Sequence, residues 1–131
     1  MQTATSNFHV RLMKKLLFII STPPYSAKRG AALLDAAMVA AAFDAEVSLM
    51  FRGDGIWSLL PNQSAEAIEQ RSFSKMSTAL ADYEIDRIYV CLDSLVSRGV
   101  KHHDFVSVQG LNLAEQQKLI ANQDAVIGAA P

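Results

Sequence analysis

Cysteine is almost absent from this chain of 131 residues, since Cys91 is the only one. A lone cysteine cannot form an internal disulfide, and no cysteine and histidine residues stand at the spacing of a zinc site. The sequence therefore predicts a reduced, cytoplasmic protein without a structural metal. A structural metal is not needed for stability, because half of the residues are apolar and can form a sufficient core. The length fits one ordinary domain.

Long runs of like charge and long apolar runs are also missing. The 12 basic and 13 acidic residues give a formal net charge of -1, so the charge pattern indicates neither nucleic acid nor a membrane as a direct partner. The apolar run at residues 16–20 stops before Pro23 and Pro24, and it is too short for a membrane span or a signal peptide. A short run of this kind is typical of a buried strand.

Phosphate-binding and metal-binding motifs form the third absence. The loop STPPYSAKRG at residues 21–30 has neither a dinucleotide nor a P-loop motif, so no nucleotide cofactor is expected. The GDG sequence at residues 53–55 is compatible with a phosphate-binding nest, but a tight turn into a helix is the favoured interpretation. The side chains of the HHD sequence at residues 102–104 are adjacent and point in different directions, and no third ligand pattern lies within sequence reach. A solvated loop is therefore favoured over a metal site.

Apolar runs of strand length alternate with helical patterns along the chain. Continuous apolar runs suit a parallel sheet that is covered on both faces, and the alternation predicts an α/β layered sandwich of four or five mostly parallel strands. Residues 1–12 are polar and without clear period, which indicates a flexible extension before a single domain at 13–131. The predicted strands are residues 16–20, 47–51, 88–92, 105–108 and 125–127, and the predicted helices are 30–43, 64–70, 73–83, 93–98 and 113–121.

Functional sites in such sheets gather at the carboxyl ends of the strands. Three loops lie there, at residues 21–29, 52–63 and 91–93. Cys91 stands at the junction of a predicted strand and a helix, where a positive helix terminus favours the thiolate. Free cysteine is also among the most buried residue types, and Asp93 would oppose a second negative charge. Spacing alone leaves a working thiol and a core residue equally supported.

The apolar segment after the GDG sequence also allows two interpretations. Ile56, Trp57, Leu59 and Leu60 form a cluster at the end of a strand. Such a cluster most often belongs to the core, whereas exposed aromatic residues at this place mark subunit contacts. An interface is therefore the second interpretation.

Three segments together resemble the DsrE/DsrF-like sulfur-relay family, and in particular its TusC/DsrF type of subunit. They are KKLLFIISTPPYS at residues 14–26, FRGDGIWSLLPNQ at 51–63 and DYEIDRIYVCLDSLVSRGV at 82–100. The resemblance extends from about Met13 to the end of the chain. It implies a flavodoxin-like three-layer sandwich and no cofactor or metal.

The resemblance also implies a function and partners. Such subunits form a heterohexamer with TusD/DsrE-like and TusB/DsrH-like subunits, and a homo-oligomer of the isolated chain is the alternative assembly. These complexes move persulfide sulfur, either for 2-thiolation of the tRNA wobble uridine or in intracellular sulfur oxidation. The resemblance does not choose between the two pathways.

Cys91 matches the position of the sulfur-carrying cysteine of TusD/DsrE-like subunits, which write this stretch as C-V-A-A-A-L-R-R-G. The match includes Arg98 and Gly99, but LDSL stands at residues 92–95 where those subunits have small residues. The sequence therefore favours a scaffold for the persulfide-carrying subunit. The alternative is an active sulfurtransferase in which Cys91 itself carries the persulfide, with Arg98 or Lys101 lowering the pKa of the thiol. Whether the chain is an enzyme depends on this choice.

Overall fold

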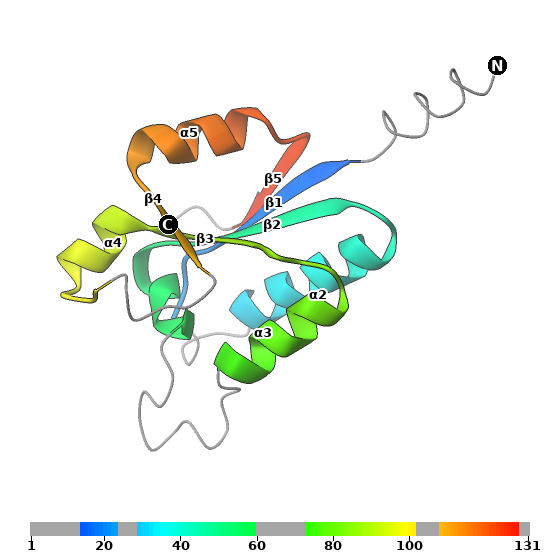
Figure 1. Ribbon diagram of the computed structural model, residues 1–131, viewed down its shortest axis with the longest axis horizontal. Coiled ribbons are helices and arrows are strands. Elements are labelled where there is room, and N and C mark those ends of the chain that lie inside the picture. The colour runs from blue at the N-terminus through cyan, green and yellow to red at the C-terminus, as the bar shows by residue number, and fades with distance from the viewer. Residues whose placement is uncertain (1–13, 24–28, 60–72, 102–107, 129–131) are drawn as a thin grey trace.

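The computed structural model describes residues 14–23, 29–59, 73–101 and 108–128, and the structural statements below concern those residues. They form five strands, four α-helices and one 3₁₀ helix, η1 (Figure 1). In chain order the elements are β1 (Lys15–Ile20), α2 (Arg29–Ala42), β2 (Glu46–Phe51), η1 (Gly53–Leu59), α3 (Phe73–Asp82), β3 (Arg87–Cys91), α4 (Leu92–Ser97), β4 (Gln109–Leu111), α5 (Leu113–Ala121) and β5 (Ala125–Gly128).

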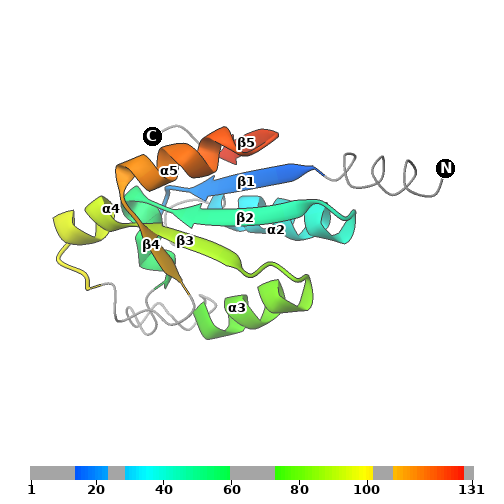
Figure 2. The same ribbon diagram turned by 45° about the horizontal axis from the view of Figure 1, so that its top comes forward.

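All five strands are parallel and lie in the order β4-β3-β2-β1-β5. This confirms the predicted α/β sandwich, although the strand order differs from the 2-1-3-4-5 order of flavodoxin itself. The chain moves from β1 to β4 in one direction and then returns past β1 to add β5. Because crossovers between parallel strands are right-handed, this reversal places α5 on the opposite face of the sheet from α2 and α3 (Figures 1 and 2).

The two faces of the sheet are covered unequally. On the α2 and α3 side lies the larger core cluster, which includes Phe18, Leu49, Phe51 and Val90. On the other side, Leu17, Ile19 and Met50 form a smaller cluster with three partly buried residues, Tyr89, Leu119 and Ile120. Both clusters come from the short apolar runs that the sequence shows, since neighbouring residues of a strand point to opposite faces.

The fourth strand lies later in the chain than the sequence analysis predicted. The apolar run at 105–108 was the expected strand, but β4 is Gln109–Leu111, and Val108 before it is buried in the larger core cluster. Residues 105–107 lie outside the described residues, and Val108 precedes the strand, so the predicted bounds were wrong at their carboxyl end. The described strand is an edge strand that pairs with Tyr89–Cys91. The other strands and the described helices lie within one residue of their predicted bounds. The predicted helix at 64–70 and the extension at 1–12 lie outside the described residues.

Three helices end in the same left-handed turn. Gly99 has φ +69° after α4, whereas Asp44 after α2 and Glu84 after α3 adopt φ 72° and 62°. In each turn the next residue donates its N–H to a carbonyl five residues earlier, for example from Val100 to Leu95. This is the Schellman arrangement, and glycine is its usual residue. Gly99 therefore stands where the sequence predicted a helix terminus.

Candidate functional site

The carboxyl ends of β1 and β2 meet beneath η1. Gly53 has a positive φ of 55° and begins this helix, so the GDG sequence is the predicted turn into a helix. A Cβ on Gly55 would lie 2.0 Å from the carbonyl oxygen of Ile20, so only glycine fits against the end of β1. The N–H groups of Gly53 and Gly55 already donate to Ser94 and Arg52. Because these donors are used, the turn is a poor phosphate nest.

Helix α4 is fixed to η1 by two contacts on one of its faces. Gly53 donates its N–H to the hydroxyl oxygen of Ser94 over 2.8 Å. One turn later, Nε of Arg98 lies 3.0 Å from a carboxylate oxygen of Asp54. Residues four apart share a face of a helix, which is why both contacts can reach the same turn. The GDG sequence therefore positions the helix that begins at Cys91.

Cys91 is the last residue of β3 and the N-cap of α4. It pairs in register with Leu111 of β4, and only 5% of its surface is exposed. Its side chain lies on the same face of the sheet as Tyr89, beneath α5, where it contacts Gln116. The sulfur therefore sits at the carboxyl edge of the sheet but under a cover of protein.

Hydrogen bonds lower the pKa of the Cys91 thiol below its ordinary value. Burial raises this pKa, but the hydroxyl of Ser94, the side-chain amide of Gln116 and the backbone N–H groups of Ser94 and Asp93 together outweigh that effect. Although Cys91 is the N-cap of α4, its side chain makes no capping hydrogen bond, so these N–H groups act on the sulfur without the geometry of a cap. The hydroxyl of Ser94 accepts from Gly53, which leaves its proton for the sulfur.

Gln116 is the site residue that the sequence analysis missed. It is 3% exposed, and its side-chain N–H donates to the carbonyl oxygen of Leu111 over 3.1 Å. A capping box between Asn112 and Glu115 fixes the start of α5 and so the direction of the next side chain. A signal was present, because Gln116 stands three and four residues before the two apolar residues with which α5 faces the sheet, Leu119 and Ile120.

Comparison with known proteins gives the family. The model of the DsrE/DsrF-like family matches residues 14–128, which is nearly the whole chain. The chain belongs to the DsrE/DsrF-like family. This confirms the resemblance seen in the sequence. The matched region contains every described strand and helix.

Relatives of this DsrE/DsrF-like chain include proteins of the expected subunit type. It is 34% identical over 97 residues to the "Intracellular sulfur oxidation protein DsrF" of Allochromatium vinosum, covering 74% of this chain and 71% of that protein. It is 31% identical over 111 residues to a "Protein TusC homolog" of Vibrio vulnificus, covering 84% and 94%. It is 35% identical over 88 residues to "Protein TusC" of Klebsiella pneumoniae, covering 67% and 74%.

A solved structure of the same fold is the ychN protein from E. coli. The TM-score is 0.74, with 18% sequence identity, over 89% of this chain and all of that one. At this identity the likeness concerns the fold alone. No helix in the described part of the DsrE/DsrF-like chain is long and apolar enough to cross a membrane.

The two basic residues predicted to stabilise the thiolate lie in different surroundings. Arg98 makes its ion pair with Asp54 and donates to the carbonyl oxygen of Ser94, so its charge is directed to the turn rather than to the sulfur. Lys101 is exposed beyond the end of α4. Neither contributes to the lowered pKa of Cys91, which comes from neutral hydrogen-bond donors.

The residues that flank Cys91 do not crowd the sulfur. Leu92 packs against the larger core cluster, which lies on the other face of the sheet from Cys91. Asp93 is exposed and contributes its backbone N–H rather than an opposing charge. The sequence departs from the small residues of TusD/DsrE-like subunits here, but the larger side chains point elsewhere.

The apolar cluster of η1 is divided between core and surface. Ile56 and Leu59 are 0% and 1% exposed and belong to the larger core cluster, so their side chains offer no surface to a partner. Trp57 is half-buried and packs against the same cluster. Leu60 lies outside the described residues. Of the proposed contact residues that the structure describes, Trp57 alone keeps an accessible part.

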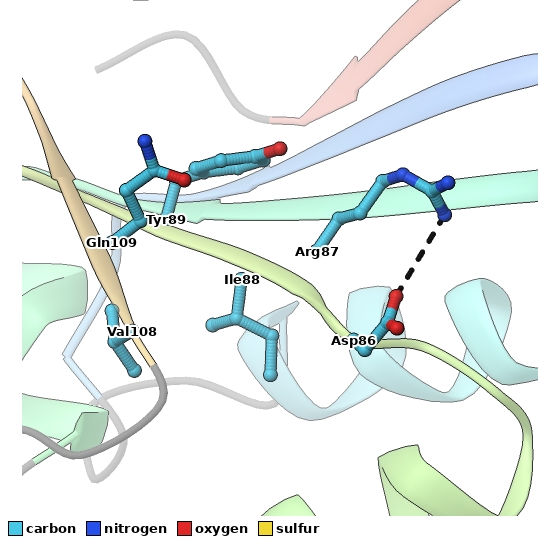
Figure 3. Close-up of a pocket in the computed structure, with 6 residues that line it drawn as sticks. All are labelled: Asp86, Arg87, Ile88, Tyr89, Val108 and Gln109. Atoms are coloured by element: carbon cyan, nitrogen blue, oxygen red, sulfur yellow. Dashed lines mark ion pairs between the residues drawn. The ribbon is translucent and has the colours of Figure 1, made fainter.

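A hollow of about 480 Å³ lies away from the thiol, beside the amino half of β3 (Figure 3). Arg87, Tyr89 and Gln109 line it from one face of the sheet, and Ile88 and Val108 from the other. None of these side chains is a strong nucleophile. Among the described residues, no three histidine, cysteine or carboxylate side chains lie close enough to hold a metal ion. Residues 102–104 are outside that description.

Proposed function

We propose that this chain is a cytoplasmic subunit of a sulfur-relay complex and that it acts mainly as a scaffold for a persulfide-carrying partner. The family and the relatives named DsrF and TusC support the sulfur-relay role. The burial of Cys91 supports the scaffold role, because a thiol with 5% exposure cannot meet the persulfide of another protein without a rearrangement.

The partners in this proposal are TusD/DsrE-like and TusB/DsrH-like subunits in a heterohexamer. The contact involves the accessible part of Trp57, which packs against the core cluster that contains Ile56 and Leu59. A large aromatic side chain that keeps an accessible part is a suitable centre for a protein interface.

The second candidate function is that of a carrier in which Cys91 itself accepts the persulfide. The lowered pKa of Cys91 favours it, because the thiolate is the attacking species. The thiolate would attack the outer sulfur of the donor persulfide, forming a new S–S bond on Cys91 while the donor cysteine leaves as a thiolate. This step needs no cofactor, but it requires that α5 or α4 uncover the sulfur.

Intact-mass measurement after incubation with a charged persulfide donor and a TusD/DsrE-like partner distinguishes the two roles. A scaffold predicts that the partner gains sulfur and co-purifies with this chain, equally with wild type and Cys91→Ser. A carrier predicts that this chain gains one sulfur atom only when Cys91 is present, and that transfer to the partner fails in the variant. A chain that stays monomeric and binds neither partner contradicts both.

The interface is tested in the same preparation with Trp57→Ala. Loss of co-purification is expected for this variant, while Val126→Ala, which truncates an exposed residue on β5, should leave the complex intact. Circular dichroism shows whether each variant retains the fold. A complex that is indifferent to Trp57→Ala would remove this surface from the proposal.

A further inference from the structure

An apolar surface lies at the opposite end of the molecule from Cys91, where helices α2 and α3 end before adjacent strands. The two turns repeat one pattern, an aromatic residue followed by an acidic residue in the left-handed conformation, Phe43-Asp44 and Tyr83-Glu84. The strands that follow are paired from Ser48 and Arg87 onward, so the turns are neighbours at the amino edge of the sheet. Both helices cover the same face of the sheet (Figures 1 and 2).

The aromatic residues of these turns are unusually exposed. Phe43 is 82% exposed and Tyr83 45% exposed, and Val39, one turn before Phe43 on α2, is 56% exposed. Three large apolar side chains at one edge of the sheet form an apolar patch, whereas most surfaces carry such residues singly. Such a surface indicates a contact with another molecule.

The charges around these residues select the class of partner. Asp44, Asp82, Glu84 and Asp86 are all exposed in the same two turns. The nearest basic residue on these turns, Arg87, already lies 3.7 Å from Asp86 and 3.9 Å from Glu46. Lys14, just before the neighbouring strand β1, and Lys15, its first residue, border the surface but belong to neither turn. The acidic side chains would repel nucleic acid and anionic lipid and would attract a basic protein.

We propose that this cap surface, made by Val39, Phe43, Asp44, Asp82, Tyr83, Glu84 and Asp86, docks a basic segment of a partner protein that presents an apolar side chain between lysine or arginine residues. The apolar centre supplies contact area, and the acidic rim supplies orientation and association rate. It lies at the amino edge of the sheet, so this partner would bind without covering the carboxyl edge and Cys91.

The positive φ angles of Asp44 and Glu84 make the rim easy to test. Glycine is the favoured residue at both positions, because a side chain is strained there. Asp44→Gly and Glu84→Gly therefore remove two charges while relieving backbone strain. The double variant is therefore expected to keep the fold, which circular dichroism checks, so that loss of binding reports on the rim charges.

The hollow beside β3 begins at the border of the cap surface. Asp86 and its ion-pair partner Arg87 stand at one end of the hollow (Figure 3), and Asp86 is also a member of the rim. A bound basic residue that competes for Asp86 would release Arg87. Resonances of Arg87 are therefore a local indicator of docking.

The test uses a synthetic amphipathic helical peptide of leucine and lysine as the probe, titrated into the isotope-labelled full chain and followed by NMR. Shifts should gather at residues 39–46 and 82–87. We expect Phe43→Ser to weaken binding about tenfold, and the Asp44→Gly, Glu84→Gly double variant to weaken it severalfold and reduce its salt dependence. Val96→Ser, which alters an exposed apolar residue at the other edge, should change nothing.

Three results would overturn the proposal. The first is shifts spread over the whole surface, and the second is equal weakening by Val96→Ser. The third is equally tight binding of a peptide in which serine replaces every leucine, because charge alone would then explain the affinity. The oligomeric state of the chain alone, measured by sedimentation, is also decisive. A dimer that Phe43→Ser converts to a monomer would overturn the proposal, because the cap surface would then bind a second copy of this chain.

Discussion

The two ends of the parallel sheet are built in different ways. At the carboxyl edge, polar groups are turned inward, and Ser94 and Gln116 direct hydrogen bonds at a buried thiol. At the amino edge, apolar groups are turned outward, and Phe43 is the most exposed large apolar residue of the described chain. Each edge thus reverses the usual distribution of side chains.

The difference follows from what each edge must do. A turn before a strand has only to end a helix and lead into the sheet, so a Schellman turn suffices and its side chains are free to face outward. A turn after a strand is crowded, because η1 packs on the end of β1 and α4 packs on η1. Crowding favours buried polar contacts with fixed partners. The carboxyl edge should therefore tolerate substitution much less than the amino edge.

The largest effect is expected at Gly55. Its added Cβ in Gly55→Ala would approach the carbonyl carbon and oxygen of Ile20 to 2.6 and 2.0 Å, and backbone atoms cannot move aside cheaply. We expect the free energy of unfolding to fall by roughly 3 kcal/mol or more, measured by urea denaturation. Gly99→Ala is the matched control, because Gly99 has φ +69° but open space around it, and its cost should be only about 1 kcal/mol. Equal losses in the two variants would contradict the packing of η1 on β1.

The next effect concerns the thiol. Gln116→Leu removes one hydrogen-bond donor from Cys91 while keeping a side chain of similar size, so the pKa of Cys91 should rise toward its ordinary value. Ultraviolet absorbance of the thiolate across a pH series measures this pKa. Gln117→Leu, at the adjacent exposed position of α5, should leave it unchanged. An unchanged pKa in Gln116→Leu would remove Gln116 from the site.

The same lowered pKa makes the stability of the chain depend on pH. Because the folded chain holds the thiolate more readily than the unfolded chain, the contribution of Cys91 is fully present above the unfolded pKa and is lost as the pH falls through the folded one. The stability of wild type relative to Cys91→Ser should therefore increase from neutral pH toward about pH 8.5, the ordinary thiol value.

The sequence predicted more of the carboxyl edge's backbone than of its chemistry. The short apolar runs and the GDG turn were sufficient to predict the fold, because strands that are buried on both faces of a parallel sheet appear in the sequence as continuous apolar runs. The spacing of Gln116 from Leu119 and Ile120 indicated that it faces the sheet, but not that it meets Cys91, since it reaches the sulfur only because β4 pairs with β3 and α5 then crosses the second face. The edge strand β4 was misplaced for a related reason, as backbone pairing leaves no apolar signature.

The amino edge offers a substitution that should stabilise the protein. Glu84→Gly relieves the strained left-handed conformation, worth about 1 to 2 kcal/mol, but adds freedom to the unfolded chain. The net gain in unfolding free energy should be roughly 0.5 to 1 kcal/mol in urea. Glu84→Ala removes the same charge but keeps the strain, so it should give no gain. A gain in both variants would mean that charge repulsion among the acidic residues, rather than the backbone, limits this turn.

The smallest effect is expected for the ion pair between Asp54 and Arg98. Its atoms lie 3.0 Å apart, but the side chain of Asp54 is 55% exposed, so solvent screens the attraction. A double-mutant cycle with Asp54→Asn and Arg98→Gln should give a coupling of about 0.5 kcal/mol that decreases with added salt. A coupling several times larger that is insensitive to salt would mean that the turn and α4 behave as one buried unit. In that case the rigid part of the carboxyl edge would reach from the thiol to the surface. A small coupling instead limits the rigid part to the contacts made by Ser94 and Gln116.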